Sequence, residues 1–118
     1  MNRTGKAGED RAAELLEKRG MRIIARNIRS KSGEIDLVAL DGEAIAFVEV
    51  KAWRSFGFED LGLSVDLKKQ RRIIETAKYF LSFHREYNGM SPRFDILFMD
   101  SGPGQTVTYL TSAFMEHV

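Results

Sequence analysis

The chain has 118 residues, of which 43% are hydrophobic and 30% are charged, and its formal net charge is +1. This length supports one hydrophobic core, so we expect a single domain over residues 1–118. The absence of cysteine excludes disulfides and thiolate zinc sites and favours a reducing, cytoplasmic location. The apolar runs are too short to cross a bilayer and the N-terminus is polar, so we expect neither a membrane segment nor a signal peptide.

The periodicity of apolar residues predicts the order α-β-β-β-α-β-β. We expect helices over about residues 6–19 and 66–87, and strands over 21–29 (near a sheet edge), 33–51 (two strands), 93–99 and 106–110. Gly20 is the expected stop of the first helix, and Phe114 and Met115 are expected to form a tail docked on the core. Because a helix separates the third and fourth strands, these should run parallel. The expected fold is therefore an α/β sandwich with a central mixed five-stranded sheet flanked by helices.

Residues 33–51 read GEIDLVALDGEAIAFVEVK, two alternating segments divided by Asp41-Gly42, which is a strong hairpin signal. Side chains in a strand alternate between the two faces of the sheet. One wall of the predicted hairpin is therefore aliphatic and is expected to pack on a helix, with Ile35, Leu37, Ala39, Ala46, Val48 and Val50 on it. The other wall is expected to line a cleft and gathers four charged side chains: Glu34, Asp36, Glu49 and Lys51.

The expected register brings two acids face to face. If Leu40 pairs with Glu43 across the turn, Glu34 lies directly opposite Glu49, and Asp36 lies diagonal to it. Two carboxylates about 4 Å apart repel by roughly 4 kcal/mol at an effective dielectric constant of about 20. A divalent cation such as Mg²⁺, which often binds one or two carboxylates and keeps several waters, would remove this repulsion.

Lys51 follows Glu49 on the same face, where it could deprotonate or orient water, or hold a phosphate as a point charge. The pattern thus favours metal-assisted phosphodiester hydrolysis. The alternative is a solvated hairpin face in which Lys51 makes a surface salt bridge worth ~0–1 kcal/mol.

Asp36, an interval of twelve residues, and then Glu49-Val50-Lys51 resemble the PD-(D/E)xK signature of restriction-endonuclease-like nucleases, which include archaeal Holliday junction resolvases. Ile35 stands where the signature name has proline. The chain as a whole looks like the small, uncharacterised bacterial YraN family. The matching landmarks are Gly8-Glu9, Gly33-Glu34-Ile35-Asp36-Leu37, Phe47-Val48-Glu49-Val50-Lys51, Lys69-Gln70-Arg71-Arg72, Arg93-Phe94-Asp95 and Ala113-Phe114.

The resemblance implies a restriction-endonuclease-like core and, through the resolvases, a possible homodimer. The site that it suggests has Asp36 and Glu49 binding Mg²⁺ or Mn²⁺, with the carbonyl of Val50 as a further ligand. Lys51 would activate water or stabilise the transition state, assisted by Glu34 and Gln70.

Two further side chains, Glu9 and Gln70, have a functional and a structural interpretation, and Asp95 has a structural one. Glu9 is either a metal or water contact, as the resemblance suggests, or an acid in the first turn of its helix. Gln70 lies on the inward face of the second helix and either contacts phosphate or water, or is a hydrogen-bonded residue at the rim of the core. Asp95 is expected to be a structural ion-pair or capping residue.

The basic residues cluster in two segments that flank the acidic hairpin. Residues 1–31 carry nine Lys/Arg against four Asp/Glu, and residues 66–93 carry seven against three. Such a distribution suits a nucleic-acid partner, although two amphipathic helices with solvated basic faces would give it too. The candidate nucleic-acid contacts are Lys69, Arg71 and Arg72 on the second helix, and Trp53 and Arg54 in a loop whose aromatics could stack on bases or form an oligomer contact.

The leading hypothesis is thus a Mg²⁺- or Mn²⁺-dependent endonuclease acting on DNA, with structured or branched DNA among the candidate substrates. The first alternative is a non-catalytic nucleic-acid-binding module that partners a DNA repair or processing factor. A structural interaction protein is a third.

Overall fold

A computed structural model describes residues 5–53, 66–100 and 107–115. Its elements, in chain order, are helix α1 (Gly5–Lys18), strands β1 (Arg22–Arg29), β2 (Glu34–Asp41) and β3 (Ala44–Trp53), helix α2 (Leu67–Phe83), the short 3-10 helix η2 (Arg85–Tyr87), and strands β4 (Ser91–Asp100) and β5 (Val107–Phe114). No helix within these ranges is long and apolar enough to cross a membrane.

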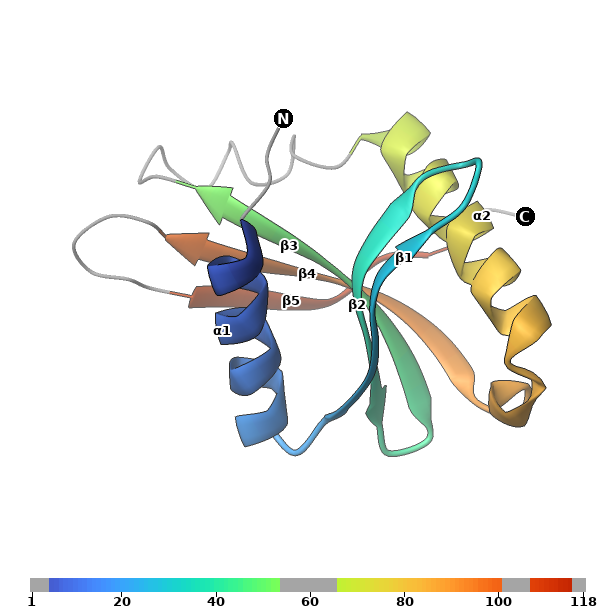
Figure 1. The fold of residues 1–118 in the computed structure, drawn as a ribbon, viewed down its shortest axis with the longest axis horizontal. Coiled ribbons are helices and arrows are strands. Elements are labelled where there is room, and N and C mark those ends of the chain that lie inside the picture. The colour runs from blue at the N-terminus through green and yellow to red at the C-terminus, as the bar shows by residue number, and fades with distance from the viewer. Residues whose placement is uncertain (1–4, 54–65, 101–106, 116–118) are drawn as a thin grey trace.

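The five strands form one sheet in the order β1-β2-β3-β4-β5 (Figure 1). The neighbours β3 and β4 run parallel, and the other pairs run antiparallel. This confirms the predicted α/β fold with a mixed five-stranded sheet, including the edge position of β1 and the parallel pair on either side of α2. The layout is consistent with a nuclease-like α/β fold.

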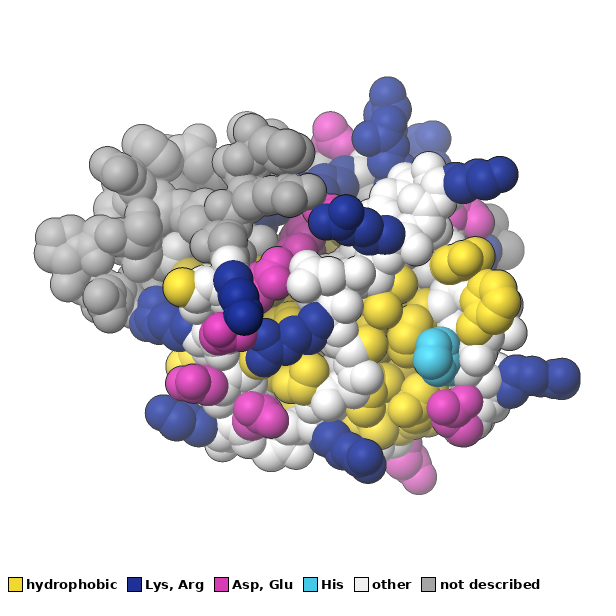
Figure 2. Space-filling model, viewed as in Figure 1, with side chains coloured by type: hydrophobic (Ala, Val, Ile, Leu, Met, Phe, Trp, Pro, Cys, Tyr) yellow, Lys and Arg dark blue, Asp and Glu magenta, His cyan; other side chains and the backbone are white. Residues whose placement is uncertain are grey.

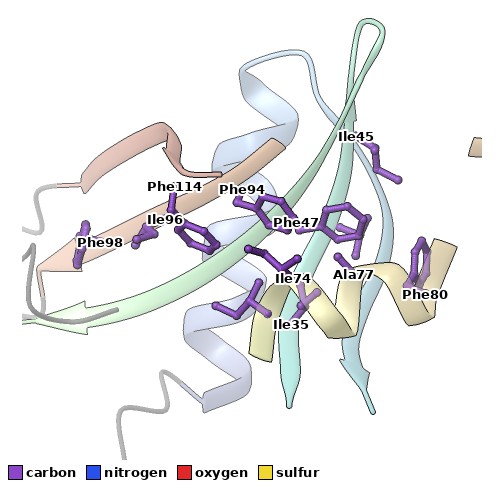
Figure 3. Packing of buried hydrophobic residues seen from close by; sticks show 12 residues of the cluster. Ile35, Ile45, Phe47, Ile74, Ala77, Phe80, Phe94, Ile96, Phe98 and Phe114 are labelled. Atoms are coloured by element: carbon purple, nitrogen blue, oxygen red, sulfur yellow. The ribbon is translucent and has the colours of Figure 1, made fainter. Parts of the chain in front are cut away.

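Each face of the sheet is covered by one helix. The α1 face buries Ala12, Ala13 and Leu16 against the aliphatic wall of the hairpin, as expected. The other face is not an open cleft, because α2 covers its middle with Ile73, Ile74 and Phe80 packed around Phe47 (Figure 3). On this face, the charged side chains near the C-terminal end of β3, around Glu49, lie outside the apolar cluster.

The predicted hairpin register is wrong by two residues. Asp41 pairs with Ala44 and Leu40 with Ile45, so the two-residue loop is Gly42-Glu43. The reason is that Gly42 itself adopts the left-handed backbone of the turn, with φ 60°, so that β2 continues through Asp41. As a consequence Asp36, and not Glu34, reaches the level of Glu49.

The regular alternation of side chains between the two faces of the sheet is also interrupted in β2, at Asp36. Ile35 packs in the cluster on the α2 side, whereas Leu37 packs in the cluster on the α1 side. Strict alternation would put both on one wall, so the predicted position of Ile35 is wrong. The neighbouring strand accommodates the change: Arg26 pairs with Leu37 and Ile28 with Ile35, and Asn27 between them has a φ of 53°.

Helix α2 is shorter than predicted, because His84 leaves the helical conformation at φ −131°. His84 still stacks on Phe80, which explains why the apolar spacing continues beyond the helix. Strand β5 is longer than predicted and includes Phe114, which pairs with Phe94 and is buried. The expected tail therefore docks as the end of a strand, and Met115 is exposed, contrary to the prediction.

Asp95 holds the end of β5 to the sheet, which confirms its predicted structural role. Its buried carboxylate lies 3.0 Å from Arg93 Nη2 and accepts hydrogen bonds from Tyr109 Oη and the Ser112 N–H. Ser112 has a φ of 51° and sits where β5 departs from regular pairing. Arg93 extends the network to Asp41 at 2.9 Å, which ties β4 to the β2–β3 hairpin.

Candidate functional site

The candidate site lies where β2 stops pairing with β3. The registered pairs between these strands extend to Leu37 and Val48. One step further, Asp36 Oδ2 accepts a hydrogen bond of 2.7 Å from the Val50 N–H. A carboxylate thus takes the place of a backbone acceptor at the end of the ladder, which fixes its position beside β3.

The carboxyl groups of Asp36 and Glu49 lie close enough to interact through a hydrogen bond, for which one of the two would have to carry a proton. Burial, then the hydrogen bond to Glu49 and the charge of that residue, raise the pKa of Asp36 from 3.8 to about 8. Burial alone would raise the pKa of Glu49, but the hydrogen bonds from Asp36 and Lys69 and the charges of Lys69 and Lys51 lower it. At neutral pH the proton of the pair therefore resides on Asp36.

Two lysines face Glu49. Its Oε2 lies 2.7 Å from Lys69 Nζ and 3.7 Å from Lys51 Nζ. Glu49 is 7% exposed and Lys51 is 5% exposed, so this part of the hairpin is not the solvated face of the alternative interpretation. Burying two ionisable side chains from water is costly unless charges pair, and here an acid lies within reach of two cations.

The two lysines differ in their protonation. Burial, then the neighbouring Lys69, lower the pKa of Lys51, although the charge of Glu49 opposes the shift. Burial would also lower the pKa of Lys69, but its contacts with Glu49 and Lys51 raise it. Lys69 thus keeps its charge more readily than Lys51, and Lys51 is the amine that more easily becomes neutral.

The two predicted assisting residues, Glu34 and Gln70, differ in how the structure places them. Glu34 belongs to β2 but points to Arg29, at 3.4 Å, in an exposed ion pair, so the expected contact with Glu49 is wrong. Gln70 is half-buried in the first turns of α2, next to Lys69 in the sequence. Gln70 therefore lies at the edge of the site.

Glu9 approaches the site from the opposite side. It lies in the second turn of α1, whose first turn contains no acid, so the first-turn interpretation is wrong. Its negative charge contributes to the raised pKa of Asp36. Glu9 Oε1 accepts a hydrogen bond of 3.1 Å from Asn27 Nδ2, and Asn27 falls between the residues of β1 that pair on either side of Asp36.

Lys69 and Asn27 are the residues whose position sequence reasoning missed. Lys69 is a predicted nucleic-acid contact, and the structure adds an ion pair between its ammonium and Glu49. No local pattern reveals this pair, because it depends on how α2 docks on the sheet. For Asn27 a signal existed: an asparagine inside an apolar and basic strand is a residue that tolerates the left-handed conformation.

The predicted nucleic-acid contacts divide into three groups. Arg71 and Arg72 are exposed on α2, within one turn of Lys69. Trp53 is the last residue of β3, where its backbone pairs with Asp100. Arg54 lies outside the described residues.

The donor set fits a hard divalent cation. In a strand, the N–H and the C=O of one residue point toward the same neighbouring strand, so the Val50 carbonyl faces the edge where its N–H meets Asp36. Two carboxylates close enough to share a proton, plus this carbonyl, are oxygen ligands of the kind Mg²⁺ or Mn²⁺ takes together with waters. Within the described residues no group of three or more His, Cys, Asp or Glu side chains could hold a metal, so the protein would supply few ligands.

Fold and site together define a class: an α/β protein with a mixed five-stranded sheet and a buried carboxylate–lysine cluster at the end of its central strand. The model of the uncharacterised protein family UPF0102 matches residues 8–99, and the chain belongs to this family. The prediction of a YraN-like family is thereby confirmed.

Several bacterial relatives are similar over most of their length. A UPF0102 protein of Treponema pallidum (strain Nichols) is 48% identical over 97% of this chain and 94% of the relative. The corresponding values are 41%, 90% and 85% for the UPF0102 protein of Alcanivorax borkumensis, and 36%, 95% and 93% for that of Pseudomonas putida (strain F1). The similarity establishes the family and names no reaction.

Proposed function

We propose that the protein is a Mg²⁺- or Mn²⁺-dependent endonuclease that hydrolyses phosphodiester bonds in DNA, including structured or branched DNA. The observation that carries the proposal is the pair of half-buried Asp36 and buried Glu49, which interact beside the buried amine of Lys51. A perturbed carboxylate pair next to a buried lysine is typical of sites that bind metal and move protons.

Asp36, Glu49 and the Val50 carbonyl would hold the metal. The bound ion would act as a Lewis acid on the phosphate and lower the pKa of the attacking water. The chain fixes the ligands beforehand, since the Val50 N–H orients Asp36 and Lys69 orients Glu49. Preorganised ligands lose little entropy when the substrate arrives.

Lys51 has two possible tasks at the reacting phosphate. Its lowered pKa favours a neutral amine, which can accept the proton of the attacking water. In its charged form it can instead stabilise the negative charge that develops on the phosphate oxygens. Glu9, through its charge on Asp36, and Gln70, at the edge of the site, would assist either task.

The test is a cleavage screen on single-stranded, duplex, flap and four-way-junction DNA with Mg²⁺ or Mn²⁺. Lys51→Met is the decisive variant, because it keeps most of the buried stem and removes the amine. Loss of a positioned proton-transfer group should lower the rate roughly 10²–10⁴-fold. Lys18→Met is the matched control, since Lys18 is an exposed lysine in the last turn of α1, away from the site.

Cleavage by wild-type protein and by Lys18→Met, but not by Lys51→Met, would support the proposal. Wild-type protein that cuts none of these substrates would contradict it. Cleavage of two opposed strands would also call for two copies of so small a chain, which sedimentation of the active mixture would reveal.

The ion pair of Lys69 and Glu49 favours a second candidate, a non-catalytic nucleic-acid-binding module for a repair or processing factor. A lysine at 2.7 Å already compensates the charge of Glu49 without any metal. Thermal unfolding with and without Mg²⁺ separates the candidates. The enzyme predicts a stabilisation by Mg²⁺ that Glu49→Gln abolishes, whereas the module predicts no response in either protein.

A further inference from the structure

We infer that the turn between β1 and β2 is a second nucleic-acid contact, and that it forms one surface with the start of α2. This surface holds the DNA phosphates that adjoin the phosphate bound at Asp36 and Glu49. This inference rests on the proposed function. It assigns a role to Arg29 and Lys31, which neither the sequence patterns nor the family similarity single out.

The turn is fixed against α2. Ser30 Oγ lies 2.8 Å from Thr76 Oγ1, and the Ser30 N–H donates to the Gly33 carbonyl at 2.8 Å. Gly33 sits so close to the helix that a Cβ placed there would lie 3.3 Å from the Cβ of Arg72. The turn and the helix therefore present their charged residues as one surface.

This surface, the basic ridge, consists of Arg29, Lys31, Lys68, Lys69, Arg71 and Arg72. The same two segments, residues 29–34 and 66–72, contain only two acids, Glu34 and Asp66. Both are engaged: Glu34 pairs with Arg29, and Asp66 caps α2 by accepting from the Lys69 N–H at 2.9 Å. Figure 2 shows Lys and Arg side chains gathered at the upper right, where Figure 1 draws the turn and the start of α2.

The ridge starts at the site and leads away from it. Lys69 contacts Glu49. Arg72 follows one helical turn later, and residues with this spacing lie roughly 5–6 Å apart at their Cβ atoms. Arg72 in turn adjoins Gly33, from which Lys31 is two residues away. Successive phosphates of one strand rise by about 3.4 Å along the duplex axis, so long basic side chains on this path can reach two or three of them.

The test measures binding of the full-length protein to a fluorescent DNA duplex over a series of salt concentrations, with Ca²⁺ in place of Mg²⁺. We expect Arg29→Gln/Lys31→Gln to weaken binding and to reduce the log–log salt slope by ~0.9 for each phosphate that is no longer neutralised, up to ~1.8 for two. Lys18→Gln/Arg85→Gln is the matched control, with the same charge change at two exposed positions outside the ridge, in the last turn of α1 and in η2. This control should keep the wild-type slope.

A third variant, Ser30→Ala, tests whether the turn must be held in place. It removes the contact with Thr76 without changing the charge, so affinity should fall while the slope stays near the wild-type value. An unchanged slope in Arg29→Gln/Lys31→Gln, while the wild type binds, would overturn this inference and leave the proposed function standing. No DNA binding by the wild type at low salt would overturn both.

Discussion

At the scale of single residues, two neighbouring carboxyl groups have pKa values shifted in opposite directions, and an amine lies beside them. The proton of the pair is assigned to Asp36 at neutral pH for two reasons. Burial disfavours the charged form of Asp36, and Lys69 and Lys51 stabilise the negative charge of Glu49. A divalent cation would have to displace this proton, so the metal-free protein and the loaded protein should respond differently to pH.

The stability of the metal-free protein should fall as the pH rises from about 5 to about 9. The pKa of Asp36 is about 8 in the folded chain against an ordinary 3.8, so the folded state retains a proton that the unfolded state has released. Stability from such a group is complete below the ordinary pKa and disappears as the pH rises through the folded value. The lowered pKa of Glu49 acts in the opposite sense, but only below about its ordinary value of 4.5, outside this window.

Urea unfolding in the presence of EDTA at several pH values measures this effect. Asp36→Asn should flatten the dependence between about pH 5 and pH 9, since the amide does not titrate. If the variant lost stability with pH as steeply as the wild type does, the proton would reside elsewhere.

At the scale of elements, the network around Asp95 attaches the C-terminal part of β5 to β4. The buried carboxylate serves Arg93, Tyr109 and the N–H of Ser112, so it satisfies groups from two strands. Removal of one partner from a buried ion pair leaves an uncompensated charge, which typically costs 3–5 kcal/mol.

Asp95→Ala should therefore lower the free energy of unfolding by roughly 3–5 kcal/mol in urea titrations. Asp10→Ala is the comparison, because it removes an ion pair with Arg26 in which both side chains are exposed. Surface pairs of this kind contribute ~0–1 kcal/mol. Equal losses for the two variants would mean that Asp95 is no more than a surface acid.

Local patterns predict which elements form and, except for Ile35, which residues of the hairpin share a wall, but not the details that create the site. Alternation placed Asp36, Glu49 and Lys51 on one side of the hairpin, and the structure brings Asp36 and Lys51 to Glu49. The register was missed because Asp41-Gly42 marks a turn without stating which of its residues is still paired. Lys69 was missed because tertiary docking, not periodicity, brings a helix terminus to a strand end.

At the scale of the whole molecule, charge is unevenly distributed although its sum is near zero. A net charge of +1 gives little long-range attraction to a polyanion, so binding must come from local concentrations of basic groups. Arg71 and Arg72 are such groups, since both are exposed on α2 beside the site.

Arg71→Ala/Arg72→Ala should weaken DNA binding and reduce the log–log salt slope by ~0.9 for each duplex phosphate that the arginines neutralise in the wild type. Fluorescence anisotropy at several salt concentrations measures both quantities. Thermal unfolding should be unchanged, because the side chains are exposed and alanine keeps the Cβ of residue 72 that adjoins Gly33. Affinity and slope equal to those of the wild type would show that these arginines are only solvated surface.

The change of facing at Asp36 links the evolution of the site to that of the interior. Leu37 on one side of this residue is anchored under α1, and Ile35 on the other side is anchored under α2. Repacking of either half of the interior would turn the carboxylate away from Glu49, even when the new core is equally stable. A substitution of Ile35 or Leu37 must therefore be matched by a substitution on the other face of the sheet, so that Asp36 keeps its orientation.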